Sequence, residues 1–448
     1  MELRTRKLFN RSFSLVSVGA IVAMSLSLVV LLGPIFIKGS SAFVFRGTVE
    51  YRMLMLDRFG RGNRAVVEAE KASAEAARKP VYDLVKRFDG EMEQGGPEFR
   101  ATYEGDFKEL KDLVLELFGP APGEPAPVLM RQQYGQTRWD RAKVKLDRIL
   151  FVEEYDYSDP TKMGVKVLKP RVERFRGTSI EPLFGDLERG IKEMMRPRLT
   201  WYWRFPFDDS YDSHFFGGIW PEMLGTIYLA IGAMLFAVPL GIVTAIYLAE
   251  YSGEGHFVSL LRTCISALAG VPSIVFGLFG LAFFINTMKV SQSKSVLAGC
   301  LTLAILVLPT VIRASEEAIK AVPLTYKEAS MSLGASKWRT ILTVILPAAL
   351  PGVLTSIIIS MGRAAGETAP IIFTAAVSVG KPLAIWQTLT QPTPALPWNI
   401  YNLATEHQAV DEIRHVQYGM VLTLVVLVLL LNLTAIIIRA RVSKKLRA

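Results

Sequence analysis

Cysteine and histidine are scarce in this chain of 448 residues, and two enzyme motifs are absent from it. It has 2 cysteines and 4 histidines, and the histidines are scattered without the spacing of a metal site. Residues 38–219 contain no cysteine, which excludes a disulfide-stapled domain there. No G-x-x-x-x-G-K-[ST] or G-x-S-x-G occurs, so the chain lacks a Walker A loop for ATP and a nucleophile elbow. The sequence therefore does not favour an enzyme, and no cofactor is expected in this chain.

Apolar residues, in contrast, are abundant: they make up 51% of the chain, and the mean hydropathy is +0.31. Several segments approach or exceed the ~20 residues that cross a bilayer. They lie near residues 13–37, 220–249, 258–288, 295–313, 341–378 and 418–438. The first is longer than the apolar core of a signal peptide, so we expect it to be retained as a membrane span. The pattern predicts an α-helical polytopic membrane protein with six transmembrane helices.

Basic residues give an orientation. They cluster before the first span, in the loop at 314–344, and after the last span. Six crossings place all three clusters on one side, which the positive-inside rule makes cytoplasmic. Both termini are therefore expected in the cytoplasm, and residues 38–219 outside the membrane.

The net charge of +10 does not indicate a nucleic-acid partner. Residues 44–216 contain 30 of the 51 basic and 30 of the 41 acidic residues, so this region is neutral. The excess lies in the rest of the chain, where membrane topology explains it. The expected non-protein partner is membrane lipid.

Residues 38–219 are rich in charge and long enough for one compact domain. Helices are expected near 61–88 and 106–118, a loop at 119–127, and strands at Lys143–Val152 and Gly164–Leu168. We predict a mixed α/β domain, and no catalytic constellation stands out in it. Its end is an aromatic cluster at residues 201–220, which we interpret as an interfacial belt rather than a ligand cage.

The polar loop at residues 325–347 separates two apolar segments. Thr325 and Glu328 have the spacing of a capping box, which predicts a helix from about Tyr326. Gly334 is placed to end that helix, and Ser336 to cap a second one. The loop is thus expected to present two short helices, with Lys327, Lys337 and Arg339 exposed, in a form that suits a groove on a partner.

A strongly polar stretch lies inside an apolar segment, at residues 361–370. Arg363 and Glu367 are four residues apart and can pair, and Gly366 and Pro370 favour a break in the helix. Because charges are costly in hydrocarbon, the pair is expected to face the protein interior or a watery path. It either lies on a transport path or only locks the helices together.

A second break is expected at Pro272, which lies mid-span beside Ser273. Gly277 and Gly280 follow within two turns. Small residues of this kind allow close approach of helices, and packing alone explains them.

These motifs resemble a known family. Glu328-Ala329-Ser330, Gly334 and Leu346-Pro347 resemble the EAA loop by which ABC-transporter permeases dock on an ATPase. With the runs at residues 268–277 and 362–370, they resemble the PstA family, permease subunits of bacterial phosphate importers. The resemblance covers roughly residues 217–440, and it departs from the usual motif in having serine at position 330. The insertion at 38–219 is similar to the extra domain of some longer members.

The resemblance implies a permease fold and a function. The chain would comprise a cytoplasmic N-terminus and first span (1–37), an extracytoplasmic insert (38–219) and a permease domain (220–448) in the bacterial inner membrane. It would form half of a phosphate path, without catalysing a reaction, beside a PstC-like second permease, with a PstB-like ATPase that binds ATP and a PstS-like binding protein. We assign the path to Arg363, Glu367, Thr368 and Ser273, and docking to Glu328, Ala329, Ser330, Gly334 and Lys337. Another oxyanion, such as phosphonate, or a membrane-anchored sensor using residues 38–219, is the alternative.

Overall fold

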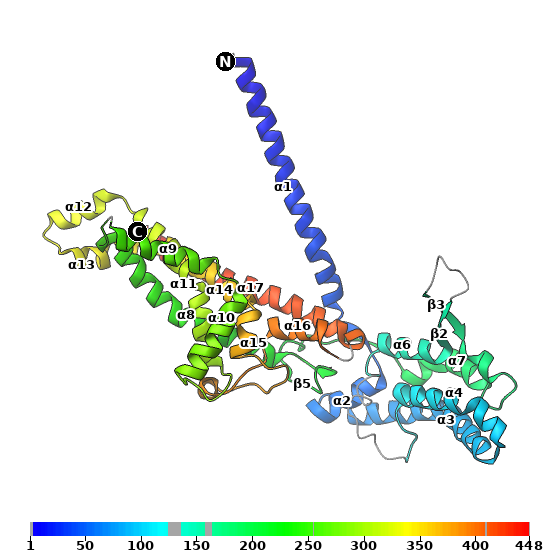
Figure 1. The fold of residues 1–448 in the computed structure, drawn as a ribbon. Coiled ribbons are helices and arrows are strands. Elements are labelled where there is room, and N and C mark those ends of the chain that lie inside the picture. Colours follow the sequence, from blue (N-terminus) through cyan, green and yellow to red (C-terminus); the bar gives the residue numbers. More distant parts are fainter. Residues whose placement is uncertain (1–2, 124–135, 157–163, 254, 408–409, 448) are drawn as a thin grey trace. The chain divides into compact units, whose positions relative to one another are not determined.

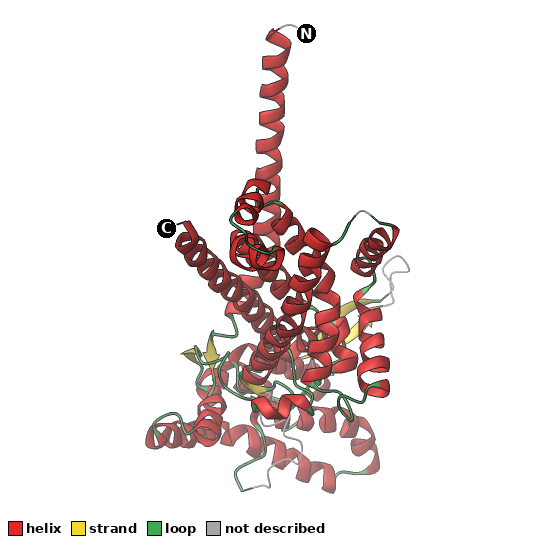
Figure 2. Ribbon diagram, turned by 90° about the vertical axis from the view of Figure 1, so that its left-hand side faces the viewer, coloured by secondary structure: helices red, strands yellow, loops and turns green. Residues whose placement is uncertain are grey.

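The computed structural model describes residues 3–123, 136–156, 164–253, 255–407 and 410–447, and these divide into two compact units. The first unit, called the permease unit below, comprises residues 1–40, 204–210 and 218–448. The second, called the insert, comprises residues 41–203 and 211–217. Helices dominate both units, and their strands are short (Figure 2).

Apolar helices that form the candidate membrane spans build the permease unit (Figure 1). They are α1 (Leu3–Ser40), α8 (Trp220–Ile246), α9 (His256–Ala269), α10 (Ser273–Gly280), α11 (Val296–Lys320), α14 (Leu346–Gly366) and α17 (Val410–Arg447). Shorter helices connect them: α12 (Leu324–Ser332), α13 (Lys337–Thr340), α15 (Ala369–Thr374), the 3₁₀ turn η6 (Ile385–Leu389) and α16 (Leu396–Thr405). Three π-helical turns extend the spans: η3 (Tyr247–Tyr251), η4 (Leu281–Thr287) and η5 (Ile341–Ile345).

Among the described residues, five helices are long and apolar enough to cross a membrane, and a bent pair makes up to six. The bent pair is α9 with the α10–η4 segment, which turns by 100° at Gly270–Pro272. The six apolar segments and the break at Pro272 predicted from the sequence are thus confirmed.

Glycines bring α8 and α11 into close contact. A Cβ on Gly241 would lie 2.6 Å from Cγ1 of Val311, and one on Gly232 would collide with the sulfur of Cys300. No real side chain tolerates such distances, so glycine is what permits this packing. Helices α11, α14 and α17 then pack in turn beside one another (Figure 1).

The insert is mostly helical. Its helices are α2 (Val49–Phe59), α3 (Arg64–Gln94), α4 (Pro97–Phe118), α6 (Trp139–Leu150), the 3₁₀ turn η2 (Arg171–Phe175) and α7 (Pro182–Met195). Its strands are β1 (Val44–Gly47), β2 (Phe151–Asp156), β3 (Val165–Pro170) and β4 (Arg198–Trp201); β5 (Ser210–Tyr211) and β6 (Phe216–Gly217) form a further short pair at the boundary of the units. Strand β1 pairs with β4, and β2 with β3, both antiparallel. The core lies between α3, α4, α6 and α7 and includes Phe88, Leu110, Ile149 and Leu187.

One predicted strand of the insert is wrong. Residues 143–150 belong to helix α6, and strand β2 begins only at Phe151. The helix forms because Trp139, Ala142, Leu146 and Ile149 recur at intervals of three or four residues and are all buried against the core. The helices near 61–88 and 106–118 and the strand near 164–168 are confirmed by α3, α4 and β3. Of the loop predicted at 119–127, residues 124–127 lie outside the described residues.

Candidate substrate path and docking loop

The break between α14 and α15 carries the ion pair that the sequence indicates. Helix α14 ends at Gly366, Glu367 has an extended backbone (φ −74°, ψ 131°), and α15 begins at Ala369. Nε of Arg363 donates to Oε1 of Glu367 over 3.2 Å. Glu367 therefore pairs with Arg363 from just beyond the helix end, so the pair lies at the break. The side chain of Arg363 is 41% exposed and that of Glu367 is 18% exposed.

The break between α9 and α10 faces the same short helix α15. A Cβ on Gly277 of α10 would lie 3.0 Å from the carbonyl oxygen of Ala369 and 3.0 Å from Cα of Pro370. Ser273 is the first residue of α10, and Thr368 immediately precedes α15; both side chains are half-buried. The two breaks thus lie on helices in direct contact, and the close approach needs the glycine, as the sequence indicates.

The polar loop forms two short helices, as expected, but one cap differs. Helix α12 begins at Leu324 after Pro323, and no side chain caps it, so the capping box predicted for Thr325 and Glu328 is wrong. Proline fixes a φ suited to a helix start, and the helix therefore begins earlier. Gly334 has the left-handed φ of +85°, and Oγ of Ser336 accepts from the backbone N–H of Arg339, as predicted.

The tips of the loop are exposed and largely apolar. Exposed large side chains include Leu324, Tyr326, Leu333 and Trp338, and Leu333 is 89% exposed. Glu328 and Ala329 are exposed on α12, whereas Ser330 is half-buried and hydrogen-bonds the hydroxyl of Thr340 over 3.0 Å. An exposed apolar patch beside a carboxylate is typical of a protein-binding surface.

Two cations hold this loop to the end of α8. Lys327 on α12 pairs with Glu250 in η3, and the Glu250 side chain is only 9% exposed. Nζ of Lys337 lies 4.7 Å from the ring centroid of Tyr251. The prediction that Lys327 is exposed is therefore wrong, while Lys337 and Arg339 are exposed. Glu250 was missed from the sequence, where its only signal is a carboxylate at the end of an apolar segment.

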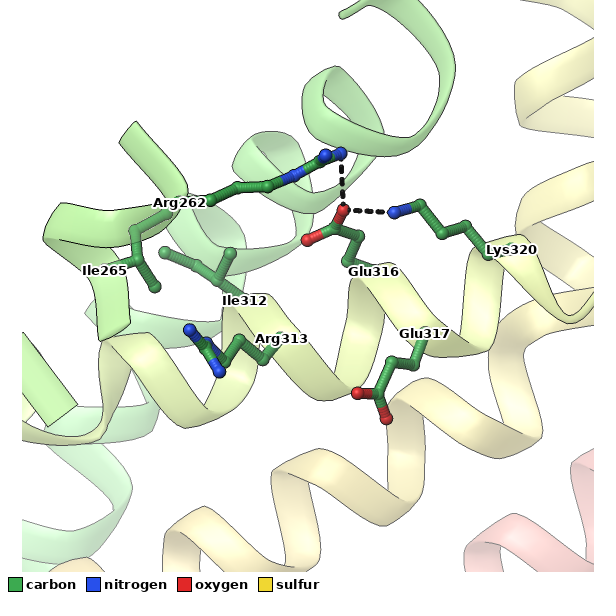
Figure 3. A pocket seen from close by; sticks show the side chains of 7 residues that line it. All are labelled: Arg262, Ile265, Ile312, Arg313, Glu316, Glu317 and Lys320. Atoms are coloured by element: carbon green, nitrogen blue, oxygen red, sulfur yellow. Dashed lines mark hydrogen bonds and ion pairs between the residues drawn. The ribbon is translucent and has the colours of Figure 1, made fainter. Parts of the chain in front are cut away.

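A cavity of about 280 Å³ lies where α9 meets the end of α11 that leads into the loop. Two of its charged residues, Arg262 and Lys320, converge on Glu316, as Figure 3 shows: Oε1 accepts from Arg262 over 3.0 Å and from Lys320 over 2.6 Å. Arg262 also donates to the carbonyl of Leu248 in η3. The cluster ties the broken span to the helix that leads into the polar loop.

Acidic side chains gather before α8. Although Asp209 is exposed at the surface, partial desolvation and the nearby charges of Asp208 and Glu222 raise the pKa of its carboxyl, against the opposing effect of Lys381. Among the described residues, no three His, Cys, Asp or Glu side chains gather in a way that would hold a metal ion.

Known proteins resemble this chain in its second half. The family model described as binding-protein-dependent transport system inner membrane component matches residues 237–448. The probable ABC transporter permease protein YqgI of Bacillus subtilis is 34% identical over 52% of this chain and 81% of its own length. The phosphate transport system permease protein PstA 1 of Mycobacterium tuberculosis is 36% identical over 55% of this chain and 77% of its own.

Solved structures offer a weaker likeness. An inward-facing structure of the MetNI methionine ABC transporter matches with a TM-score of 0.39 and 17% identity, over 50% of this chain and 94% of that one. Because that TM-score is low, the family of this chain is assigned from its sequence relatives alone. The chain is a multi-pass membrane protein and belongs to the PstA family of ABC importer permeases.

Proposed function

We propose that this chain forms half of the translocation path of an importer for inorganic phosphate. The relative from Mycobacterium tuberculosis is named as a phosphate transport permease, and this supports phosphate as the substrate. The observation that carries the proposal is the Arg363–Glu367 pair, which lies at a helix break between two apolar segments. Such charges are costly in a membrane unless they serve a path or a partner.

The chemistry of Arg363 suits an oxyanion. A guanidinium has five N–H donors, keeps its charge at every working pH, and binds phosphate oxygens in a bidentate manner. Among the described residues only its Nε donates, to Glu367, and 41% of the side chain is exposed. Donors are therefore left for a passing anion. Glu367 holds the arginine when the path is empty and, being negative, weakens the anion's binding enough to let it leave.

The proposal includes partners and an orientation. A PstB-like ATPase would dock on the exposed tips of α12 and α13, where Glu328 and Gly334 lie, and a PstC-like permease would complete the path. A PstS-like binding protein would deliver phosphate from the side of the insert. The termini and the docking loop would be cytoplasmic in the bacterial inner membrane, and the chain itself would catalyse no reaction.

Uptake of labelled phosphate by the importer, reconstituted with its ATPase, second permease and binding protein, tests the role of the pair. Arg363→Gln is expected to reduce uptake at least about tenfold, because it removes the charge that favours the anion. The double variant Arg363→Gln with Glu367→Gln leaves no unpaired charge, so it should assemble normally and still fail to transport. Arg441→Gln, which removes an exposed arginine near the end of α17, is the matched control and should transport normally.

Restored uptake in the double variant would show that the pair only locks the helices.

A second set of uptake measurements addresses the substrate. Excess unlabelled phosphate should abolish uptake, and excess methylphosphonate should not. If methylphosphonate competes equally, the path carries oxyanions more broadly.

A further inference from the structure

The sheet of β1 and β4 has one buried face and one exposed apolar face. Its register opposes Val44 to Trp201 and Arg46 to Leu199, so these four side chains share a face. Trp203 follows two residues after the end of β4 and is exposed as well. The exposed fractions are 48% for Val44, 76% for Leu199, 76% for Trp201 and 59% for Trp203. We call these four residues, together with Arg46, the outer face.

The opposite face of the sheet is fixed by packing. Phe45 and Tyr202 are buried, and both rings contact Tyr51, with centroids 5.1 and 6.2 Å apart. The guanidinium of Arg138 lies 4.1 Å from the centroid of the Phe45 ring. Because a strand can turn its outer residues inward only by losing these contacts, the outer face is held away from the core of the insert.

The composition of the outer face suits a lipid surface. Two indoles, a leucine and a valine surround a single charge, which is the positive Arg46, and no carboxylate is among them. Tryptophan concentrates at membrane interfaces, where its apolar ring and its N–H group are both satisfied. A single arginine can reach lipid phosphates from the same position.

The chain also keeps this face near the membrane. The apolar part of α1 is 28 residues long, Phe13–Ser40, and α1 ends only four residues before Val44. That part measures roughly 42 Å at 1.5 Å per residue, close to the ~40–45 Å of a whole bilayer with its headgroups. Four residues extend by at most about 14 Å. Strand β1 therefore starts at, or just above, the headgroups where α1 emerges.

We propose that the outer face inserts into the headgroup region of the bilayer and anchors the insert in the plane of the membrane. The anchor adds to the tether that α1 provides at one end and α8 at the other. It does not depend on which substrate the permease unit carries.

Fluorescence quenching in proteoliposomes tests this anchor. The full chain is reconstituted in phosphatidylcholine whose acyl chains carry bromine near the headgroup, and in unbrominated phosphatidylcholine. Trp201→Phe with Trp203→Phe removes the two fluorophores and keeps aromatic rings in place. The emission lost by this substitution should be at least about twofold smaller in brominated than in unbrominated lipid, because lipid already quenches those indoles. Trp139→Phe, at a buried tryptophan of the insert, is the control and should lose equal emission in both lipids.

Iodide in the aqueous phase gives the complementary measurement. If lipid covers Trp201 and Trp203, iodide should not quench the emission that the double substitution removes. Two results would overturn the proposal. Strong quenching by iodide would place the indoles in water, and quenching by neither agent would place them against protein.

Discussion

Arginine is used differently in the insert and in the permease unit. In the insert, Arg78 is 5% exposed, and its guanidinium donates to Glu50 and to the carbonyls of Met194 and Phe118. Those carbonyls lie at the C-terminal ends of α7 and α4, where a helix leaves acceptors without partners. In the permease unit, Arg363 is 41% exposed and donates to Glu367 alone among the described residues.

The difference separates a charge that is committed to structure from one that is open to a ligand. Each nitrogen of the Arg78 guanidinium donates to an acceptor, and the centroid of the Phe118 ring lies 5.0 Å from it. Substituting Arg78 should therefore lower the free energy of unfolding of the insert. Substituting Arg363 should instead lower the rate of transport. The Lys327–Glu250 pair is intermediate in burial between Arg78 and Arg363, with side chains that are 24% and 9% exposed. Substituting Lys327 should therefore affect the local order of the polar loop.

The largest effect is expected for Arg78→Met. The change leaves Glu50 and the ends of α4 and α7 without their donor, and breaking a buried pair in this way costs about 3–5 kcal/mol of unfolding free energy. Limited proteolysis of the purified chain in increasing urea measures the unfolding of the insert. Arg189→Met, at an arginine whose side chain is 79% exposed, should change it by less than about 0.5 kcal/mol. Equal effects of the two variants would refute the comparison.

A smaller effect is expected for Lys327→Gln. The substitution leaves the largely buried carboxylate of Glu250 unpaired, so helix α12 should unfold locally more often. Amide hydrogen exchange in Leu324–Ser332 should therefore accelerate about tenfold, which corresponds to about 1.4 kcal/mol in the free energy of local opening. Reversing the pair with Lys327→Glu and Glu250→Lys should slow exchange again. The control is Arg339→Gln, at an exposed arginine of α13. Unchanged exchange in Lys327→Gln would mean that the pair does not position the loop.

The smallest effect is expected for Asp209→Asn. The raised pKa of Asp209 means that the folded state favours the protonated carboxyl over the charged one. The free energy of unfolding therefore falls as pH rises above the ordinary pKa of an aspartate side chain. The variant should be more stable than the wild type at neutral pH, within about 0.5 kcal/mol for a surface change. The gain should vanish below about pH 3.9. Melting temperatures of both proteins across this range test the sign, and a gain that grows at low pH would contradict it.

Local features of the permease unit could be read from the sequence because single residues dictate them. Pro272 and Gly366 interrupt apolar helices, and Gly334 and Ser336 end one short helix and begin another. Each effect arises from the backbone freedom or the capping group of one residue. The same reasoning failed at Thr325, because Pro323 starts the helix first.

Contacts between distant segments could not be read in this way. Lys327 and Glu250 are 77 residues apart, and Arg262 and Glu316 are 54 apart. Nothing in either local sequence specifies its partner, since the pairing depends on how α8, α9 and α11 pack. In the insert, a strand is expected from Lys143, but the face formed by Trp139, Ala142, Leu146 and Ile149 is buried against the core and stabilises a helix.

The glycine contacts between α8 and α11 also limit how the permease unit can move. With Gly241 against Val311 and Gly232 against Cys300, the surfaces of the two helices interlock, and sliding one past the other would drive backbone into side chain. Sliding between these helices would therefore require their interface to repack. A bend at Gly270–Pro272 or at Glu367–Thr368 would cost less, because these residues lie between helices and no regular helix has to be broken there. The two interruptions are therefore the places where a bend would cost least, and the interlocked pair of α8 and α11 is where sliding would cost most.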